Sequence, residues 1–357
     1  AVARFAWEAV CALAGRDLAP GARIIDPAAG EGALLAAAAR CQTTGIEIDR
    51  QLVQKAGRVA EKIYVGDGLL GTFAEEVDGV FDCVLANPPF GKLRPILPLL
   101  GRDAKNVIRQ RFSVSSIMTK KTLETLPVEV LFIERALQMV RPKGWLSLIL
   151  PESFFANARL QKVRDWLGER AEVRAVVALP SDSFRRKGLN ARTALVVLRQ
   201  GQGRASARTI GIKGEEHTAD LYLQEALRAI RGRVWRQDVI ALSSVPPRAR
   251  VGRRWDPQYW QGHRALEKLS RRVALVPLGD YVSHLTYGPI ITGSRPSHVD
   301  IGVPVIRQRD IVETGLDEDD LLRVTPRGPH DPPRSRVCEG DLLLPRSGVG
   351  TLGRNRL

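Results

Sequence analysis

The apolar run Phe81–Ala86 ends abruptly in Asn87-Pro88-Pro89-Phe90, which can neither extend a strand nor begin a helix at low cost. Each proline fixes φ and removes a backbone donor, and the residue before a proline is pushed out of the α region. We therefore expect a stiff corner at the carboxyl end of a strand. The Asn87 side-chain oxygen and the Pro88 carbonyl can there point at one spot beside an aromatic ring. Such a corner suits the binding of an exocyclic amino group and the stacking of its base; a plain proline-rich turn is the alternative.

Short apolar runs alternate with helical patterns on both sides of this corner. The expected strands are 23–25, 43–48, 63–65, 81–86, 145–150, 173–179 and 193–198. The expected helices are 5–14, one that runs to about residue 40, 51–62, 128–140 and 158–170. Strands that alternate with helices form a parallel sheet with helices on both faces. The sequence therefore predicts an α/β fold with a doubly wound, Rossmann-like sheet.

The length and charge of the chain suggest its domain number and its partner. A chain of 357 residues exceeds one ordinary domain, so we expect two. The net charge of +15 favours a polyanionic partner, usually nucleic acid, over the alternative that the charge only keeps the protein in solution. Residues 201–256 read as a surface connection with one helix and a Pro/Arg-rich linker, and the short apolar pieces after residue 257 as a smaller α+β domain.

The cysteines and histidines show no ligand-like spacing, so we expect neither a disulfide framework nor a metal site. No apolar run reaches the ~18 residues of a membrane span, and no signal peptide is visible. We therefore expect a cytoplasmic protein without membrane contact. Because the chain lacks an initiator Met and stops in a Gly/Arg-rich stretch, we expect it to be a fragment at one or both ends.

Acidic and glycine residues follow the first three expected strands. The turn 26–32 contains Gly30 and opens a helix, where glycines let the backbone approach a ligand and the helix N-terminus offers free N–H groups. Glu47, 17 residues after Gly30, can accept hydrogen bonds from two ribose hydroxyls, and Asp67 can bind an adenine amino group. Carboxyl ends of consecutive parallel strands are where such sheets bind ligands. This spacing predicts a nucleotide-type site, with a mere tight turn as the alternative for the glycines alone.

The segments 26–32, 45–49, 66–68 and 87–90 together resemble the ordered motifs of N6-adenine DNA methyltransferases, in the group whose cofactor motif precedes the catalytic one. Residues 141–154 are similar to the later strands of type I modification subunits and of related type IIG fusions. The resemblance covers roughly residues 5–200. It implies a methyltransferase domain over residues 1–200 that uses S-adenosylmethionine.

The resemblance also implies roles for single residues. Those expected to bind S-adenosylmethionine, from its methionine end to its adenine, are Asp26, Ala28, Gly30, Gly32, Glu47, Ile48, Asp67 and Gly68. Those expected to hold and stack the target base are Asn87, Pro88, Pro89 and Phe90, with Phe184 as a second stacking ring. The Thr-Pro pair that usually begins the family's N-terminal helix is missing here, which leaves that cofactor contact open.

The chemistry of an adenine amino group fits the corner at Asn87. Its nitrogen is a poor nucleophile because the lone pair is delocalised into the ring. Two acceptors, the Asn87 oxygen and the Pro88 carbonyl, would draw the two hydrogens out of plane, so that positioning and electrostatics supply most of the catalysis. The base must first leave the duplex. The basic segment 91–127, with Lys92, Arg109 and Arg111, would then hold phosphates, unless it is an ordinary solvated face.

The C-terminal segments 254–260, 276–282, 302–311 and 340–348 carry a second resemblance, to target-recognition domains of type I specificity subunits. It implies that residues 257–357, incomplete at the C-terminus, read a DNA sequence. The candidate base or phosphate contacts are Arg307, Gln308, Arg309 and Arg346, because Arg and Gln suit purine edges. The acidic run 313–320 is expected to face away from DNA.

The hypothesis from the sequence is a site-specific adenine-N6 DNA methyltransferase of a restriction–modification or phage-defence system. Its expected partners are duplex DNA and a restriction or specificity subunit. Two alternatives remain open at this stage. The first is a methyltransferase of RNA bases or of protein glutamine, whose amino groups suit the same corner. The second is a DNA-binding subunit that has lost its chemistry.

Overall fold

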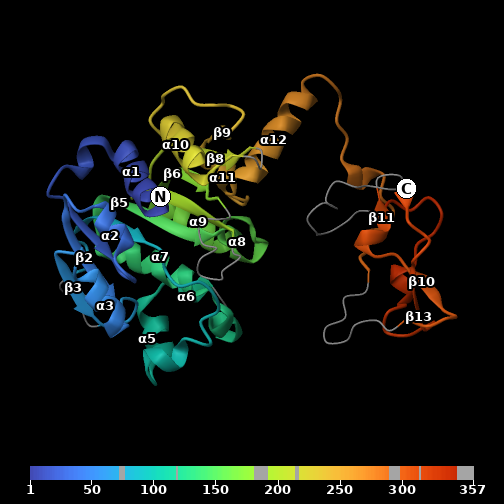
Figure 1. Cartoon of the computed structure of the whole chain (residues 1–357), viewed down its shortest axis with the longest axis horizontal. Coiled ribbons are helices and arrows are strands. Elements are labelled where there is room, and N and C mark those ends of the chain that lie inside the picture. Colours follow the sequence, from blue (N-terminus) through green and yellow to red (C-terminus); the bar gives the residue numbers. More distant parts are fainter. Residues whose placement is uncertain are drawn as a thin grey trace. The chain divides into compact units, whose positions relative to one another are not determined.

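The structure is a computed structural model of the chain. It describes residues 1–71, 77–117, 120–180, 192–213, 217–288, 298–312 and 315–343, without the side chains of residues 120–122 and 308. The chain divides into two compact units, Ala1–Val273 and Ala274–Leu357, and each is described by itself (Figure 1). Among the described residues, no helix combines the length and apolarity needed to cross a membrane.

One sheet organises the described part of the first unit, with the strand order β3-β2-β1-β4-β5-β7-β6-β8-β9. The strands are β1 Arg23–Asp26, β2 Gln42–Glu47, β3 Lys62–Val65, β4 Phe81–Ala86, β5 Val140–Pro151, β6 Ala171–Ala178, β7 Thr193–Gln200, β8 Ala207–Ile212 and β9 Ile240–Val245. The five strands from β3 to β5 are parallel to one another, whereas β7 runs antiparallel to both of its neighbours, β5 and β6. The predicted doubly wound α/β sheet is confirmed.

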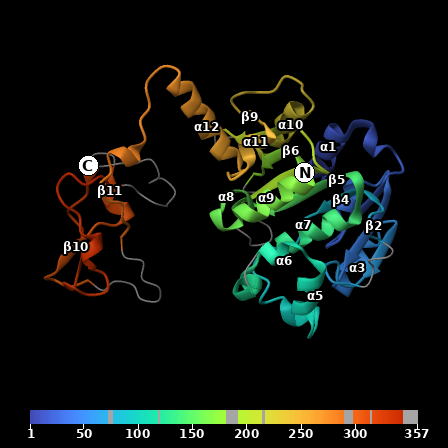
Figure 2. The same ribbon diagram turned by 180° about the vertical axis from the view of Figure 1, so that it is seen from behind.

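Helices cover both faces of this sheet. The α-helices described in the first unit are α1 Val2–Ala14, α2 Ala33–Ala37, α3 Arg50–Ala56, α5 Ala104–Arg111, α6 Val114–Ile117, α7 Val128–Met139, α8 Glu152–Ala156, α9 Gln161–Arg170, α10 Ala219–Ile230, α11 Pro247–Arg250 and α12 Pro257–Ser270. Successive side chains of a strand point to opposite faces. Thus Val84 of β4 packs in the core beneath α7 and α9, and Leu85 packs in the core beneath α1 and α10 (Figures 1 and 2).

Helix α7 is buried around almost its whole circumference. One side packs on the sheet, and the other is covered by apolar residues of the segment 91–127, including Ile108 of α5 and Val114 of α6. A helix that is buried on all sides needs such double cover. The long basic segment between β4 and α7 is therefore partly a structural layer, seen beside α7 in Figure 2.

The predicted division of the chain differs from the structure. Residues 201–256 do not form a surface connection, because β8 pairs in parallel with β6, and β9 pairs antiparallel with β8, which extends the sheet by two strands. The first unit continues through α12 to Val273. The alternation of β8 is carried by only a few apolar residues between Gly- and Arg-rich stretches, which hid the strand in the sequence.

The second unit is built from very short elements in its described part. Its strands are β10 Val303–Val305, β11 Ile311–Val312, β12 Gly315–Leu316 and β13 Leu322–Val324, paired antiparallel as β10 with β13 and β11 with β12. The apolar piece at 303–306 thus contains a strand, whereas those at 273–278 and 281–284 form none. Polar pairs, described below, take much of the place of an apolar core.

Candidate active site

The ends of four neighbouring parallel strands meet at one edge of the sheet. Asp26 of β1 lies opposite Gly45 of β2, and Ile25 of β1 lies opposite Val84 of β4. The registers bring the residues that finish β1 and β2 beside the corner that follows β4. Sequence-predicted residues that lie far apart in the chain are therefore gathered at this edge.

Asp26 is a buried carboxyl group at the centre of the edge. It is 1% exposed, and its Oδ1 accepts a hydrogen bond from the Ala28 N–H at 3.0 Å. Burial raises the pKa of Asp26 to about 7, and the negative charge of Glu47 acts in the same direction. A carboxyl group with this pKa is held half-ionised near neutral pH, where a nearby positive charge would ionise it fully.

Glu47 ties the turn after β1 to the end of β2. Its Oε2 accepts from the Gly30 N–H at 2.7 Å, and its Oε1 accepts from the Asp49 N–H at 2.9 Å. A carboxylate offers about four acceptor positions, so about two remain for a ligand after these two bonds. Gly30 has φ +57°, in the left-handed region that favours glycine. Ile48, next in the chain, is 55% exposed beside them and offers an apolar surface.

Two other predicted cofactor residues owe their identity to close packing. A Cβ on Gly68 would lie 1.9 Å from the Pro27 carbonyl oxygen, and a Cβ on Gly32 would lie 2.6 Å from Val59 Cγ2. The loop after β3 can thus press on the turn after β1 only with glycine there. Asp67 shapes the same loop, because its two oxygens accept from the Leu69 and Leu70 N–H groups at 2.9 and 3.0 Å.

Asp26 and Glu47, at the ends of β1 and β2, make up what we call the acidic half of the edge, and the corner after β4 differs from it. Asn87 Oδ1 is buried and has no hydrogen-bond partner among the described residues. Pro88 is buried, Pro89 is exposed, and Phe90 is half-buried against the core beneath α1. A buried acceptor without a partner costs about 1–3 kcal/mol, and such groups in native structures call for an explanation. A bound amino group would supply the missing donor.

Glu129 is a candidate that sequence reasoning missed. It is 3% exposed in the first turn of α7, and its Oε2 accepts from the Gly91 N–H at 3.2 Å. The Gly91 carbonyl in turn accepts from the Val128 N–H at 2.8 Å. Burial raises the pKa of the Glu129 carboxyl group. Gly91 directly follows the corner, and the start of α7 therefore binds both its N–H and its carbonyl. An acidic residue opening an apolar helix was the available signal.

The predicted phosphate contacts of the segment 91–127 do not behave alike. Lys92 and Arg109 are exposed. Arg111 instead donates to the Leu70 and Gly71 carbonyl oxygens at 3.1 and 3.3 Å, which ties α5 to the loop after β3. Arg111 therefore has a structural task that its position in a basic run did not reveal.

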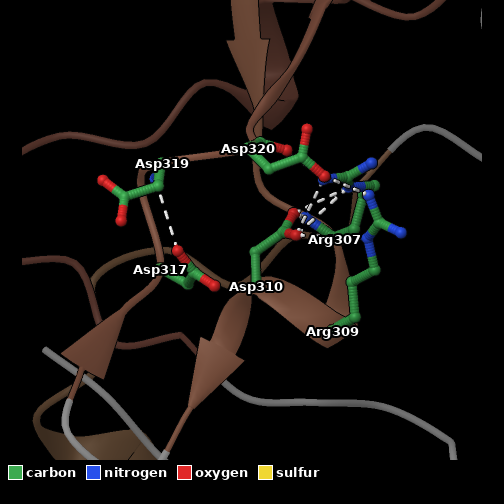
Figure 3. A network of polar contacts seen from close by, with 6 residues as sticks. All are labelled: Arg307, Arg309, Asp310, Asp317, Asp319 and Asp320. Carbon is green, nitrogen blue, oxygen red and sulfur yellow. Dashed lines mark hydrogen bonds and ion pairs between the residues drawn. The ribbon is translucent and has the colours of Figure 1, made fainter.

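Two of the predicted DNA contacts of the second unit, Arg307 and Arg309, are paired with carboxylates (Figure 3). Arg307 donates to both oxygens of the buried Asp310, at 2.8 and 2.9 Å, and also to the Asp320 backbone carbonyl. Arg309 donates to Asp320 Oδ2 at 2.9 Å. Asp320, the last residue of the acidic run 313–320, therefore pairs with Arg309 and also accepts from Arg307. Phe184 and Arg346 lie outside the described residues, as does the side chain of Gln308.

Comparison with known proteins agrees with this arrangement. Residues 42–184 match the family of Eco57I restriction-modification methylases. No curated protein matches the chain. The type IIG restriction endonuclease BpuSI is 19% identical with a TM-score of 0.54, over 76% of this chain and 33% of the endonuclease.

Two type I proteins have a similar fold. A methyltransferase subunit from Streptococcus thermophilus is 17% identical with a TM-score of 0.51, and a modification subunit from Vibrio vulnificus is 16% identical with a TM-score of 0.50. Each similarity covers 68% of this chain and 54% of the subunit. The chain thus spans about a third of the endonuclease and about half of the subunits. The fold resembles that of restriction–modification methyltransferases, and the methylase match agrees with S-adenosylmethionine as the predicted cofactor.

Proposed function

We propose that this protein is a DNA methyltransferase that transfers a methyl group from S-adenosylmethionine to the N6 amino group of adenine, after the base has been flipped out of the duplex. The observation that carries the proposal is the unpartnered, buried Asn87 Oδ1 beside Pro88, at the sheet edge that also holds Asp26 and Glu47. An amide oxygen and a backbone carbonyl offer acceptors only, and an exocyclic amino group offers two hydrogens.

The residues of the acidic half fit S-adenosylmethionine by their chemistry. This cofactor supplies an electrophilic methyl group on a positively charged sulfur, and it carries a second positive charge on its amino group. Asp26 is a buried carboxyl group poised to ionise beside a cation. Glu47 keeps acceptor positions for ribose hydroxyls after its two backbone bonds, and the exposed Ile48 offers an apolar surface for a base.

The corner after β4 would act on the amino group by geometry. Asn87 Oδ1 and the Pro88 carbonyl accept its two hydrogens and direct the nitrogen lone pair away from the ring. The peptide that carries the Pro88 carbonyl joins two prolines, Pro88 and Pro89, which restrict its backbone. The acceptors are therefore fixed in place and need little reorganisation when positive charge develops on the amino nitrogen. Phe90 would stack on the extruded base, which replaces part of the stacking lost on leaving the duplex. The extra proton on nitrogen can leave to water after transfer.

The setting that fits this activity is a restriction–modification or phage-defence system. The methylase match to residues 42–184 supports it. In this proposal, the second unit contributes to recognition of the DNA sequence, and a restriction or specificity subunit is a further partner. Because Asp310 neutralises Arg307, we expect the second unit to contact DNA mainly through other residues.

The test is transfer of tritiated methyl from S-adenosylmethionine by the full chain to duplex DNA, RNA and protein in parallel. We expect label in duplex DNA, recovered as N6-methyladenine after nucleoside digestion, and about 10²- to 10³-fold slower labelling with Asn87→Ala. Label in RNA or in protein glutamine, with none in duplex DNA of varied sequence, would overturn the proposal. Label in cytosine would correct the target base while keeping the class of reaction.

A further inference from the structure

The excess positive charge of the chain belongs to the first unit alone. Ala1–Val273 contains 44 Lys and Arg against 28 Asp and Glu, a net charge of +16. Ala274–Leu357 contains 10 Arg and no Lys against 11 Asp and Glu, a net charge of −1. A polyanion is therefore drawn to the first unit, although the second unit is the one that resembles a recognition domain.

This charge is concentrated where the first unit ends. Residues 246–273 hold eight Lys and Arg against two acidic residues, Asp256 and Glu267. Asp256 is fully buried and paired with Arg254, and Glu267 lies 3.5 Å from His263. Six exposed cations remain that form no ion pair with any described residue. We call them the α12 basic surface: Arg248, Arg253, Arg264, Lys268, Arg271 and Arg272.

Helix α12 and its C-cap present half of these cations on one side. Arg264, Lys268 and Arg271 follow one another at intervals of four and three residues, which lie on one helix face. The last two cations, Arg271 and Arg272, follow the C-terminus of the helix, where the helix dipole favours positive charge. Figure 1 shows α12 leaving the sheet, and residues 264–273 are all exposed.

The base of α12 is rigid and is joined to the candidate active site. Asp256 accepts from the Tyr259 N–H at 3.0 Å and so caps the helix, and Trp260 is buried. The Trp255 N–H donates to the Phe155 carbonyl at 2.9 Å. Phe155 belongs to α8, which directly follows β5, and β5 is the parallel neighbour of β4. The basic helix is thus fixed to the element that continues the strand beside the Asn87 corner.

We infer that the α12 basic surface binds the phosphate groups of duplex DNA that flank the target base. This inference rests on the proposed function and assigns its main backbone contact to the end of the first unit. The contrast with the second unit supports it, because Arg307 and Arg309 are paired with Asp310 and Asp320. The cations of the α12 basic surface are exposed and form no ion pair with a described residue, and the single hydrogen bond among them, from Arg264 to the Ser244 carbonyl at 2.7 Å, leaves its charge unneutralised.

The test is a triple variant, Lys268→Ala, Arg271→Ala and Arg272→Ala, of the full chain. Alanine keeps the helix. Binding to a fluorescent duplex is followed by anisotropy at several salt concentrations. We expect affinity to fall by about 10- to 100-fold at low salt and the slope of log K against log salt to decrease by about 2 to 3, because each phosphate contact contributes about 0.9. Cofactor binding and the melting temperature should stay at wild-type values.

The matched control removes three exposed cations elsewhere in the first unit, by Arg40→Ala, Arg58→Ala and Arg204→Ala. It should lose less than threefold in affinity. An equal loss in both variants would mean that only net charge matters, and an unchanged affinity in the α12 variant would also overturn the inference. If wild type methylates duplex DNA but the α12 variant binds as wild type does, the inference alone fails. If wild type binds duplex DNA through α12 without transferring methyl, the proposed function alone fails.

Discussion

The two halves of the sheet edge satisfy their polar groups in opposite ways. On the side of β1 and β2, both oxygens of Glu47 and one oxygen of Asp26 accept backbone N–H groups, so that half is shaped before any ligand arrives. On the side of β4, Asn87 Oδ1 is buried without a partner in the described chain. The first half is built by its own backbone, and the second is completed by a ligand.

This difference separates what substitutions in the two halves should do. Residues of the acidic half support the protein's own turns as well as a ligand, so their loss should affect binding and stability together. Asn87 Oδ1 accepts no hydrogen bond from a described residue, so its loss should affect the reaction while leaving the fold intact. Measuring turnover, cofactor affinity and stability for the same variant therefore shows to which half of the edge a residue belongs.

The largest effect is expected for Asn87→Ala. Turnover should fall by about 10²- to 10³-fold, as is typical when one preorganised hydrogen-bonding group at a reacting centre is removed. The free energy of unfolding should stay equal or rise by about 1 kcal/mol, because a buried unsatisfied acceptor disappears. Single-turnover methylation and denaturant unfolding measure the two quantities. A loss of stability beyond 2 kcal/mol would show that Asn87 supports the fold, and the contrast between the two halves would be lost.

The next largest effect is expected in the acidic half, for Glu47→Gln. An amide cannot accept at both ends, so either the Gly30 or the Asp49 N–H loses its partner. We expect cofactor affinity to fall by about 10- to 100-fold and the melting temperature to drop with it. Calorimetric titration and thermal unfolding measure both. The matched control is Glu31→Gln in the same turn, an exposed carboxylate paired with Lys55, which should change affinity by less than about twofold. If Glu31→Gln lowered cofactor affinity as much as Glu47→Gln does, Glu47 would have no specific role in cofactor binding.

The sequence was enough for the parts that depend on local chemistry. The apolar run 81–86, the two prolines after Asn87 and the glycine-containing turn 26–32 are properties of neighbouring residues, and they predicted the sheet and the order of its motif-bearing ends. Strands β8 and β9 escaped because their pairing with β6 and with each other joins distant segments. Short, weakly apolar strands become recognisable only when their partners are known.

Charged residues were hardest to interpret from the sequence, because a hydrogen-bond partner 3 to 41 residues away decides what a charged side chain does. Arg307 looked like a DNA contact but is held by Asp310, and Arg111 looked like a phosphate contact but holds two carbonyls after β3. Glu129 was overlooked for the same reason, because its partner Gly91 lies 38 residues upstream. Periodicity cannot reveal such pairs.

A smaller effect is expected where the protein holds the corner from behind, at Glu129. Glu129→Leu removes the acceptor of the Gly91 N–H, so the corner can move, and turnover should fall by about tenfold while cofactor affinity stays within twofold. Glu129→Gln keeps an acceptor oxygen and should recover most of the turnover. Single-turnover rates with saturating cofactor make the comparison. If the Gln and Leu variants lose equally, the charge of Glu129 and not its hydrogen bond would be what matters.

The smallest effect is a pH dependence on the acidic half. Burial raises the pKa of Asp26 to about 7 from its ordinary 3.8, so the unfolded chain loses this proton first. Its contribution to the free energy of unfolding therefore falls as pH rises between these values and is constant above them. Cofactor affinity has the opposite trend, because only ionised Asp26 attracts a cation, and should rise severalfold, by at most about tenfold, from pH 6 to pH 8. Calorimetric titration of wild type and Asp26→Asn at pH 6, 7 and 8 isolates this group, since the cofactor's own titration is common to both. Parallel pH profiles in the two proteins would mean that Asp26 does not meet the charge of the cofactor, and the acidic half would then be a support for the turn alone.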